Sequence, residues 1–254
     1  MKSILFTILL ALPLWALAQT QGTVTYKETI KLNIEFELPE GMDEALLAQI
    51  PNSQSATKVL YFNETESIFK DAPAEDEAEG TSWNGSSGGA EVRMVMRQPE
   101  SSFYLNFEEE RRIEQREFMG KVFRINGDMP SYEWKITSEQ KTFEDYVLMQ
   151  ATFEDSTRKI VAWFCPQIPV SGGPDAFTQL PGLVLEVDIN DGERTLVATE
   201  VSLGEPAEAI EKPKKGKEIT QEEFEAVVAE KMKEMEAEYG GSSGDGEVRI
   251  MIRN

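Results

Sequence analysis

The sequence predicts a mainly β protein with one C-terminal helix, folded as a curved antiparallel sheet or half-open barrel on which the helix packs. Three observations support this fold class. The first segment after the N-terminal apolar run alternates apolar and polar residues. About ten short apolar segments follow one another without long helical patterns between them, which favours antiparallel strands over βαβ units. Helical spacing with clear end signals occurs near the C-terminus.

The alternating segment covers residues 24–38. Its apolar side chains all fall on even positions: Val24, Tyr26, Ile30, Leu32, Ile34, Phe36 and Leu38. Period two predicts one long strand, or a pair of strands, with one buried face. Residues 42–50 place apolar side chains on one side of a short predicted helix, which ends before Pro51.

A hairpin is expected from residues 58–62 and 67–70, which flank a turn at Asn63-Glu64. The acidic segment 71–80 and the Gly/Ser-rich segment 85–89 are interpreted as loops. Further strands are predicted at residues 91–97, 103–107, 112–118, 121–125, 132–136, 146–153, 159–165, 183–189 and 195–203.

The C-terminal part differs in composition. Residues 205–217 are charged and contain prolines, which is typical of a solvated linker. Thr220 and Glu223 can form a capping box, and Ile219 and Phe224 are placed as a hydrophobic staple. The predicted organisation is a signal peptide (1–18), an antiparallel β domain (19–204), and a C-terminal part (205–254) with the linker, an amphipathic helix (220–239) and a strand (247–253).

Residues 85–98 and 241–254 form an internal repeat in which eight of fourteen positions are identical. Antiparallel pairing of the two copies would place Glu91 opposite Arg253 and Arg97 opposite Glu247. We therefore predict that the C-terminal strand docks beside residues 91–97. Independent edge strands or mobile tails are the alternative.

The N-terminus has the pattern of a cleavable secretion signal. Lys2 precedes an apolar run over residues 4–17, and Ala16-Leu17-Ala18 supplies a small-x-small cleavage site. Polar residues follow too soon for a membrane span, and no second apolar run reaches spanning length. We expect an exported protein with no transmembrane segment in its mature chain.

Composition argues against several classes of function. The net charge of −21 makes nucleic acids and anionic lipids poor partners. There is no histidine, which removes the commonest general base and the ordinary zinc sites. Among 46 acidic residues no catalytic pair stands out. Met94 and Met96, like Met232 and Met235, have the spacing of copper ligands, but core packing explains both pairs. The sequence predicts no enzyme activity, no cofactor and no metal.

The most distinctive segment, residues 159–190, is expected to form a strand, a Pro/Gly-rich loop and a second strand. Prolines stiffen such a loop, and glycines permit positive φ angles. Two interpretations stay open: the loop closes the core, or it forms a ligand- or partner-binding site. The candidate site residues are Trp163, Phe164, Ile168, Pro169, Gly173, Pro174, Phe177, Leu180, Pro181, Gly182 and Leu183.

This segment resembles the GLPGLI family, whose motif is a strand ending Ala-Trp-Tyr-Thr, then Ile-Pro, Gly-Pro and Gly-Leu-Pro-Gly-Leu-Ile. The matching residues are Ala162, Trp163, Phe164, Ile168, Pro169, Gly173, Pro174, Leu180, Pro181, Gly182, Leu183 and Val184. Gln179 replaces the first motif Gly, and Cys165, the only cysteine, replaces the Thr. The family consists of exported proteins of Gram-negative bacteria, some associated with outer-membrane receptor systems. The resemblance implies a periplasmic or outer-membrane-associated location and no particular activity.

The leading functional hypothesis is a non-enzymatic binding or carrier protein of the cell envelope for an apolar ligand or a lipidated partner, similar in architecture to periplasmic lipoprotein carriers. Its concave face would be lined by Tyr26, Ile30, Ile34, Trp134 and Trp163. The alternative is an adaptor that docks on an outer-membrane receptor or transporter, and a carboxylate-based hydrolase is a distant third. A carrier needs an internal apolar cavity, an adaptor has a filled core, and a hydrolase needs two converging carboxylates.

Overall fold

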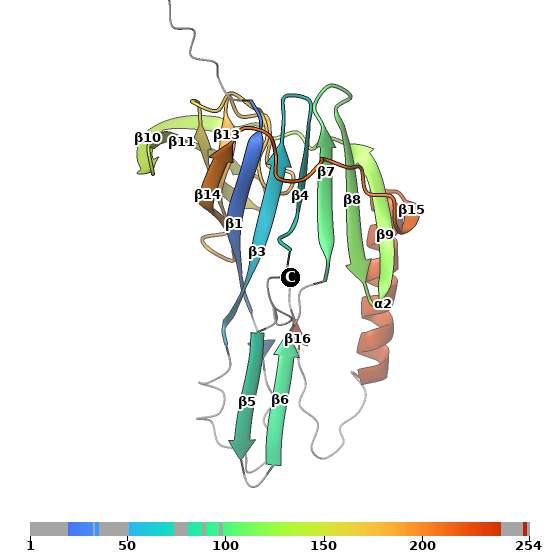
Figure 1. The fold of residues 1–254 in the computed structure, drawn as a ribbon. Helices are drawn as coiled ribbons and strands as arrows, with labels where there is room; N and C mark the ends of the chain where they lie inside the picture. Colours follow the sequence, from blue (N-terminus) through green and yellow to red (C-terminus); the bar gives the residue numbers. More distant parts are fainter. Residues whose placement is uncertain are drawn as a thin grey trace, which may run out of the picture.

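The computed structural model describes residues 20–32, 34–35, 51–73, 81–87, 90–96, 99–239 and 251–252. Within these residues the protein is mostly β, with one helix, α2 (Gln221–Tyr239), and a largest sheet of twelve strands. The sheet is open rather than closed into a barrel (Figure 1). The predicted fold class is confirmed. The predicted signal peptide (1–18) and short helix (42–50) lie outside the described residues.

The main sheet is antiparallel throughout, except that its last strand, β15, pairs parallel to β9. In spatial order its strands are β10 (Lys135–Phe143), β11 (Tyr146–Glu154), β12 (Lys159–Cys165), β13 (Leu183–Ile189), β14 (Arg194–Leu203), β1 (Gly22–Lys31), β3 (Ser53–Phe62), β4 (Glu66–Asp71), β7 (Ser101–Asn106), β8 (Arg111–Phe118), β9 (Lys121–Asp128) and β15 (Lys217–Ile219).

The connection between β9 and β10 shows why the sheet must be strongly curved. Residues 129–134 join these strands, although they lie near opposite edges of the sheet. The ten interstrand spacings between them would measure about 48 Å in a flat sheet. The connecting chain can reach at most about 24 Å. The sheet therefore bends until its two ends approach, which creates a concave and a convex face.

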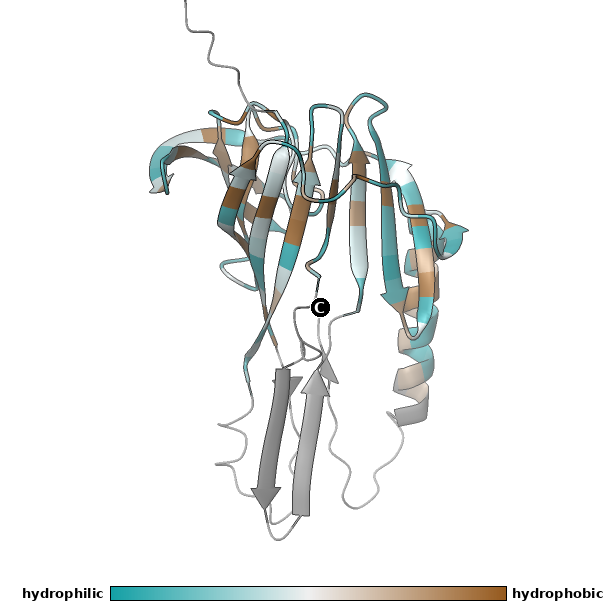
Figure 2. Cartoon of the chain, viewed as in Figure 1, coloured by the Kyte–Doolittle hydropathy of each residue, from teal (hydrophilic) through white to brown (hydrophobic). Residues whose placement is uncertain are grey.

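The main hydrophobic core lies on the concave face. Along β1, buried side chains alternate with less buried ones, whereas β3 ends in five consecutive buried residues. Val24 and Tyr26 of β1 and Leu60 and Phe62 of β3 belong to this core and have no exposed surface. Figure 2 shows apolar, brown bands within these strands. The Pro/Gly-rich loop (residues 166–182) packs into the same core. Period two in the sequence thus correctly predicts which face of β1 is buried.

A smaller core lies on the convex face, where the chain between β14 and β15 crosses the sheet (Figure 1). We call residues 205–216 the strap. The strap has no helix or strand, as predicted for a linker, yet Ile210 packs against a cluster of Val59, Tyr61, Ile68 and Tyr104. The strap is therefore bound to the sheet rather than surrounded by solvent.

Helix α2 begins with the predicted capping box. The Thr220 hydroxyl accepts a hydrogen bond of 3.2 Å from the Glu223 amide, and the Glu223 carboxylate accepts one of 2.9 Å from the Thr220 amide. Ile219 and Phe224 pack with Phe123 and Ile125 of β9. These contacts attach the first turns of α2 to the edge of the main sheet.

The predicted pairing of the internal repeat is wrong. Strand β6 (Ala90–Met96) pairs with its neighbour β5 (Thr81–Ser87), and β16 (Met251–Ile252) pairs with β2 (Ile34–Glu35). Residues 240–250, which include most of the predicted C-terminal strand, lie outside the described residues. Loop closure favours the local hairpin, because joining the two repeats would close a loop of more than a hundred residues. The Gly/Ser-rich segment interpreted as a loop supplies part of β5.

Candidate functional site

The Pro/Gly loop (residues 166–182) folds back on the strands that precede and follow it. The Leu183 amide donates to the Ile168 carbonyl at 3.0 Å, and the Val184 amide donates to the Gly172 carbonyl at 2.9 Å. At Gly182, with φ of +151°, an added Cβ would lie 2.2 Å from the Cys165 carbonyl oxygen. Only glycine fits this close crossing of two backbones. The loop is therefore a packed part of the core.

Most of the predicted site residues come together in this loop and in the strand ends that flank it. The side chains of Phe164, Ile168, Phe177, Leu180 and Leu183 are at most 4% exposed, and Gly173, Pro174 and Gly182 are also buried. Pro169 and Pro181 are exposed.

Trp163 differs from the other predicted site residues in that it is half-buried and packs at the border of the main core. Its strand neighbours Ala162 and Phe164 are fully buried in the concave core, so Trp163 points to the convex face. There the Lys141 ammonium lies 4.3 Å from the centroid of its ring. The prediction that Trp163 lines the concave face is wrong, because strict alternation places it on the other side of β12. Tyr26 and Ile30 are buried and half-buried on β1, and the side chain of Ile34 is not among those described.

Four aromatic rings cover the end of the loop. Tyr132 and Trp134, from the connection between β9 and β10, pack with their ring centroids 5.1 Å apart. Tyr132 also contacts Phe153 at 5.3 Å and Phe177 at 5.8 Å. The Trp134 indole N–H donates to the Thr178 carbonyl at 2.8 Å. The aromatic cluster thus holds the connection against the loop.

The two departures from the family motif have a clear structural setting. Gln179 adopts φ of +69°, the left-handed region that favours glycine, which is the residue of the motif at this position. Its side-chain oxygen accepts a hydrogen bond of 3.2 Å from the Tyr132 amide. Cys165 is fully buried, and burial raises the pKa of its thiol. Neither position presents a reactive group to solvent.

Charged side chains occupy the concave face beside this apolar region. We call Glu28, Lys58, Asp71, Asp175 and Arg194 the concave charged cluster. Lys58 lies 2.5 Å from Asp71 and 3.7 Å from Glu28, and Arg194 lies 2.7 Å from Glu28 and 2.6 Å from Asp175. The side chains of Lys58 and Glu28 are only 4% exposed. Five side chains from β1, β3, β4, β14 and the loop therefore form one chain of ion pairs.

The charges in this cluster depend on one another. Burial alone would lower the pKa of Arg194, but the carboxylates of Asp175 and Glu28 outweigh burial and raise it. Removing one member of a buried ion pair leaves the charge of the other member buried, with neither water nor an opposite charge to stabilise it. The cluster is thus held in a single arrangement, and its outer members keep contact with solvent.

Strand β8 adds a second charged group to the same face. Glu114 pairs in register with Phe103, which belongs to the concave core, so both point to that side. Glu114 is 4% exposed and forms an ion pair with Arg116. Burial raises the pKa of Glu114, and Asp175 raises it further against the opposing effect of Arg116 and Arg112.

Arg112 connects β8 to the start of helix α2. Its terminal nitrogen donates to the Gln221 side-chain oxygen at 2.9 Å, and its guanidinium lies 5.9 Å from the centroid of the Phe103 ring. Its Nε is buried and has no hydrogen-bond partner among the described residues. The charged face is thus bordered by the Pro/Gly loop on one side and by the start of α2 on the other.

Sequence reasoning missed this charged face. Among 46 acidic residues none of the carboxylates stands out by type. A usable signal existed, however, because Glu28 and Lys58 are in phase with the apolar residues of their strands. Glu28 follows Val24 and Tyr26, and Lys58 precedes Leu60, always at even spacing. A charged residue at a position where the alternation expects a buried side chain indicates either a buried ion pair or a functional site.

No group of acidic or cysteine side chains in the described part of the chain is arranged to hold a metal ion. Within the same residues, no helix combines the length and apolar character needed to cross a membrane.

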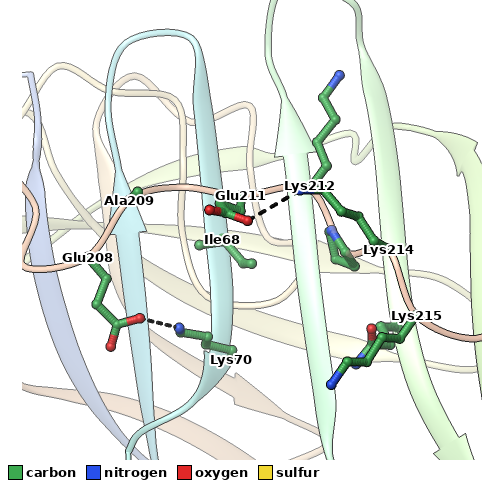
Figure 3. Close-up of a pocket in the computed structure, with 10 residues that line it drawn as sticks. Ile68, Lys70, Glu208, Ala209, Glu211, Lys212, Lys214 and Lys215 are labelled. Atoms are coloured by element: carbon green, nitrogen blue, oxygen red, sulfur yellow. Dashed lines mark hydrogen bonds and ion pairs between the residues drawn. The ribbon is translucent and has the colours of Figure 1, made fainter.

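A surface pocket lies on the convex face, beneath the strap (Figure 3).

Comparison with known proteins links the loop to a family and the sheet to a known fold. Residues 153–186, from the end of β11 to β13, match a family described as a protein of unknown function (Porph_ging). No curated protein sequence matches the chain. The structure is similar to that of PNGF-II in its P21 crystal form, with a TM-score of 0.53, 15% identity, and coverage of 83% of this chain. The C2 form gives a TM-score of 0.49, 15% identity and 81% coverage.

The chain spans about one third of the length of the PNGF-II chain that it matches, since 33% of that chain is covered. At this identity the likeness concerns the fold alone. The curved sheet of this protein therefore also occurs as one part of a longer polypeptide.

Proposed function

We propose that this chain is an exported, non-enzymatic binding protein of the cell envelope, which docks on a partner protein through its charged concave face. The observation that carries the proposal is the exposed outer side of that face. Buried Glu28, Lys58 and Glu114 fix the positions of Asp71, Arg116 and Arg194, whose side chains remain 36%, 46% and 30% exposed. Charges that are already held in place can bind a complementary surface with little loss of side-chain entropy.

The filled core favours an adaptor over a carrier of apolar ligands. The loop side chains of Ile168, Val170, Phe177 and Leu180 occupy the apolar part of the concave face themselves. The adaptor was the alternative hypothesis from sequence, and the packing of the loop is the reason to prefer it.

Export and membership of the GLPGLI family form part of this proposal. The support for export is the signal-like segment 1–18. The support for the family is the loop with its buried Gly-Pro and Leu-Pro-Gly-Leu segments, which also lies within the matched residues 153–186. We place the mature protein in the periplasm or at the outer membrane.

Site-specific photo-crosslinking in cells tests the docking face. A photoreactive residue in place of Asp71, at the exposed side of the charged face, should give a discrete protein adduct. The same residue in place of the exposed Thr199 on the convex side serves as the matched control. The Arg116→Glu variant should remove the adduct. Equal adducts from both positions, or an adduct that survives Arg116→Glu, would exclude the charged face as the docking surface.

A second candidate function rests on Glu114. A buried carboxyl with a raised pKa that interacts with a second carboxyl group, here Asp175, resembles the acid and base pair of hydrolases. Assays with p-nitrophenyl esters and glycosides would detect such an activity. Hydrolysis that is lost in Glu114→Gln, together with no discrete adduct from position 71, would favour the hydrolase over the adaptor.

A further inference from the structure

The pocket on the convex face is formed by the strap and the strands below it. Its volume is about 650 Å³, enough for a small-molecule ligand. Figure 3 shows the strap passing over β4 and β8, with side chains from both directions around the pocket. The lining residues are Ile68, Lys70, Gln115, Glu208, Ala209, Glu211, Lys212, Pro213, Lys214 and Lys215. We call it the lysine pocket.

The first half of the strap is fixed by polar and apolar contacts. The Glu208 carboxylate accepts hydrogen bonds from Lys70 at 2.6 Å and from the Tyr61 hydroxyl at 3.2 Å. The hydrogen bond from Lys70 and its positive charge lower the pKa of Glu208. Two residues later, Ile210 packs into the convex core beside Ile68. The chain thus has no freedom to lift away from the pocket at this end.

The second half of the strap is fixed at β9. The Lys214 carbonyl accepts a hydrogen bond of 3.3 Å from Arg124. Gly216, with φ of +103°, passes so close to β9 that an added Cβ would lie 2.9 Å from the Phe123 carbonyl carbon. Strand β15 then pairs with β9. Because both ends are held, the backbone that carries Lys214 and Lys215 is positioned before any ligand binds.

The pocket has an excess of positive charge in a strongly acidic protein. Four lysines and two glutamates line it, a net formal charge of +2, whereas the whole chain carries −21. Lys70 pairs with Glu208 at 2.6 Å and Lys214 with Glu211 at 3.4 Å, and Lys212 pairs with Glu109, which lies outside the pocket lining, at 3.8 Å. Lys215 points toward the pocket in Figure 3 and forms no ion pair with any residue in the described ranges. A positive charge without a partner, between fixed neighbours, favours an anionic ligand.

We propose that the lysine pocket binds the phosphate group of a phosphomonoester. Ammonium groups reach it from β4 and from the strap, and such single charges suit a tetrahedral phosphate with several oxygens. No arginine lines the pocket, so the anion would be held by lysine ammonium groups acting as point charges, which is a common way to bind phosphate. Gln115 adds a neutral donor, and Ile68 and Pro213 provide apolar contact for the organic part of the ligand.

Calorimetric titration with glycerol 3-phosphate at low ionic strength tests the proposal. We expect saturable binding, weakened about tenfold or more in a Lys214→Gln/Lys215→Gln variant because two charged contacts are lost. A Lys231→Gln/Lys233→Gln variant on helix α2 has the same net charge and should bind as the unaltered protein does. No saturable binding, or equal weakening in both variants, would overturn the proposal, since equal weakening reports only the overall charge.

Two further probes identify the source of the phosphate. Binding of glycerol 3-phosphate without binding to vesicles of phosphatidylcholine and phosphatidic acid assigns the pocket to a soluble phosphomonoester. Vesicle binding that needs phosphatidic acid and is lost in the Lys214→Gln/Lys215→Gln variant assigns it to a lipid headgroup. Vesicle binding that is unchanged in this variant, together with no binding of glycerol 3-phosphate, counts against the pocket.

Discussion

The hydroxyl of Tyr26 on β1 donates a hydrogen bond of 2.6 Å to the Val184 carbonyl at the start of β13. Tyr26 is fully buried, and burial raises the pKa of its hydroxyl. The bond ties the first strand to the end of the Pro/Gly loop across 158 residues of sequence. The loop is therefore anchored from the opposite side of the core as well as by its own backbone.

Removing this hydroxyl should destabilise the protein. We expect Tyr26→Phe to lower the free energy of unfolding by about 1–3 kcal/mol, because the Val184 carbonyl would remain buried without a donor. Urea unfolding followed by tryptophan fluorescence measures the change. Tyr61→Phe on the convex face, where the hydroxyl is partly solvated, should have a smaller effect. Equal effects of the two substitutions would show that the buried bond adds little.

The loop should not tolerate a side chain at Gly182. The Gly182→Ala variant should lose roughly 3 kcal/mol of stability, because its Cβ would overlap the Cys165 carbonyl and its φ of +151° is strained for alanine. Gly120→Ala is the control, since Gly120 also has a positive φ but nothing lies within 4 Å of an added Cβ. The control should lose only about 1 kcal/mol. Thermal unfolding curves that rank the two variants in the other order would contradict the packing described for the loop.

The buried ion pairs should matter more than the exposed ones. Replacing Lys58 with Met leaves Glu28 buried with one cationic partner fewer, and should lower the free energy of unfolding by about 3–5 kcal/mol. Lys159, whose pair with Asp191 is exposed, gives the comparison, and Lys159→Met should leave the unfolding midpoint unchanged. A mild effect of Lys58→Met would mean that the concave charged cluster relaxes or is better solvated than its burial implies.

Glu114 should make stability depend on pH in the direction opposite to an ordinary ion-paired carboxylate. Burial raises the pKa of Glu114 in the folded protein, so between about pH 4.5 and that raised value the folded state binds more protons than the unfolded state. Stability therefore falls as the pH rises through this window. Glu114→Gln should remove this part of the fall, which urea unfolding at a series of pH values can measure as a difference between variant and parent. A parallel pH dependence in the two proteins would show that Glu114 has an ordinary pKa.

The single cysteine should be inert in the folded state. Cys165 is fully buried, and burial raises the pKa of its thiol, so little thiolate is available and a reagent has no access. We expect labelling by a thiol-specific disulfide reagent to be slow without denaturant and rapid in the denaturant that unfolds the chain. Fast labelling of the native protein would mean that the loop opens.

Local elements could be predicted from the sequence because their determinants are close in the chain. The bounds of β12 and β13 match the predicted segments 159–165 and 183–189. The capping box of α2 is present at Thr220 and Glu223. Alternating burial and helix capping depend on residues a few positions apart, so a single sequence contains the necessary information.

Pairing between distant segments could not be predicted in the same way. The opposite charges of the two repeat copies suggested a pairing partner for β6. Opposite charges can be matched in many different strand registers, however, and forming a short hairpin with β5 costs less chain entropy. The placement of Trp163 failed for a related reason. Its burial depends on which face of β12 is covered by the Pro/Gly loop, and the strand itself contains no record of that face.

By itself, the sequence determined that this protein is built from short strands with one buried side, a distinctive Pro/Gly loop and a capped C-terminal helix. Only the tertiary structure decided that the loop fills the concave core, and that Glu28 and Arg194, 166 residues apart, meet there. The physical reason is that alternation orients side chains only with respect to their own strand. Which charges become neighbours depends on the order of strands across a sheet bent enough to bring its two ends together.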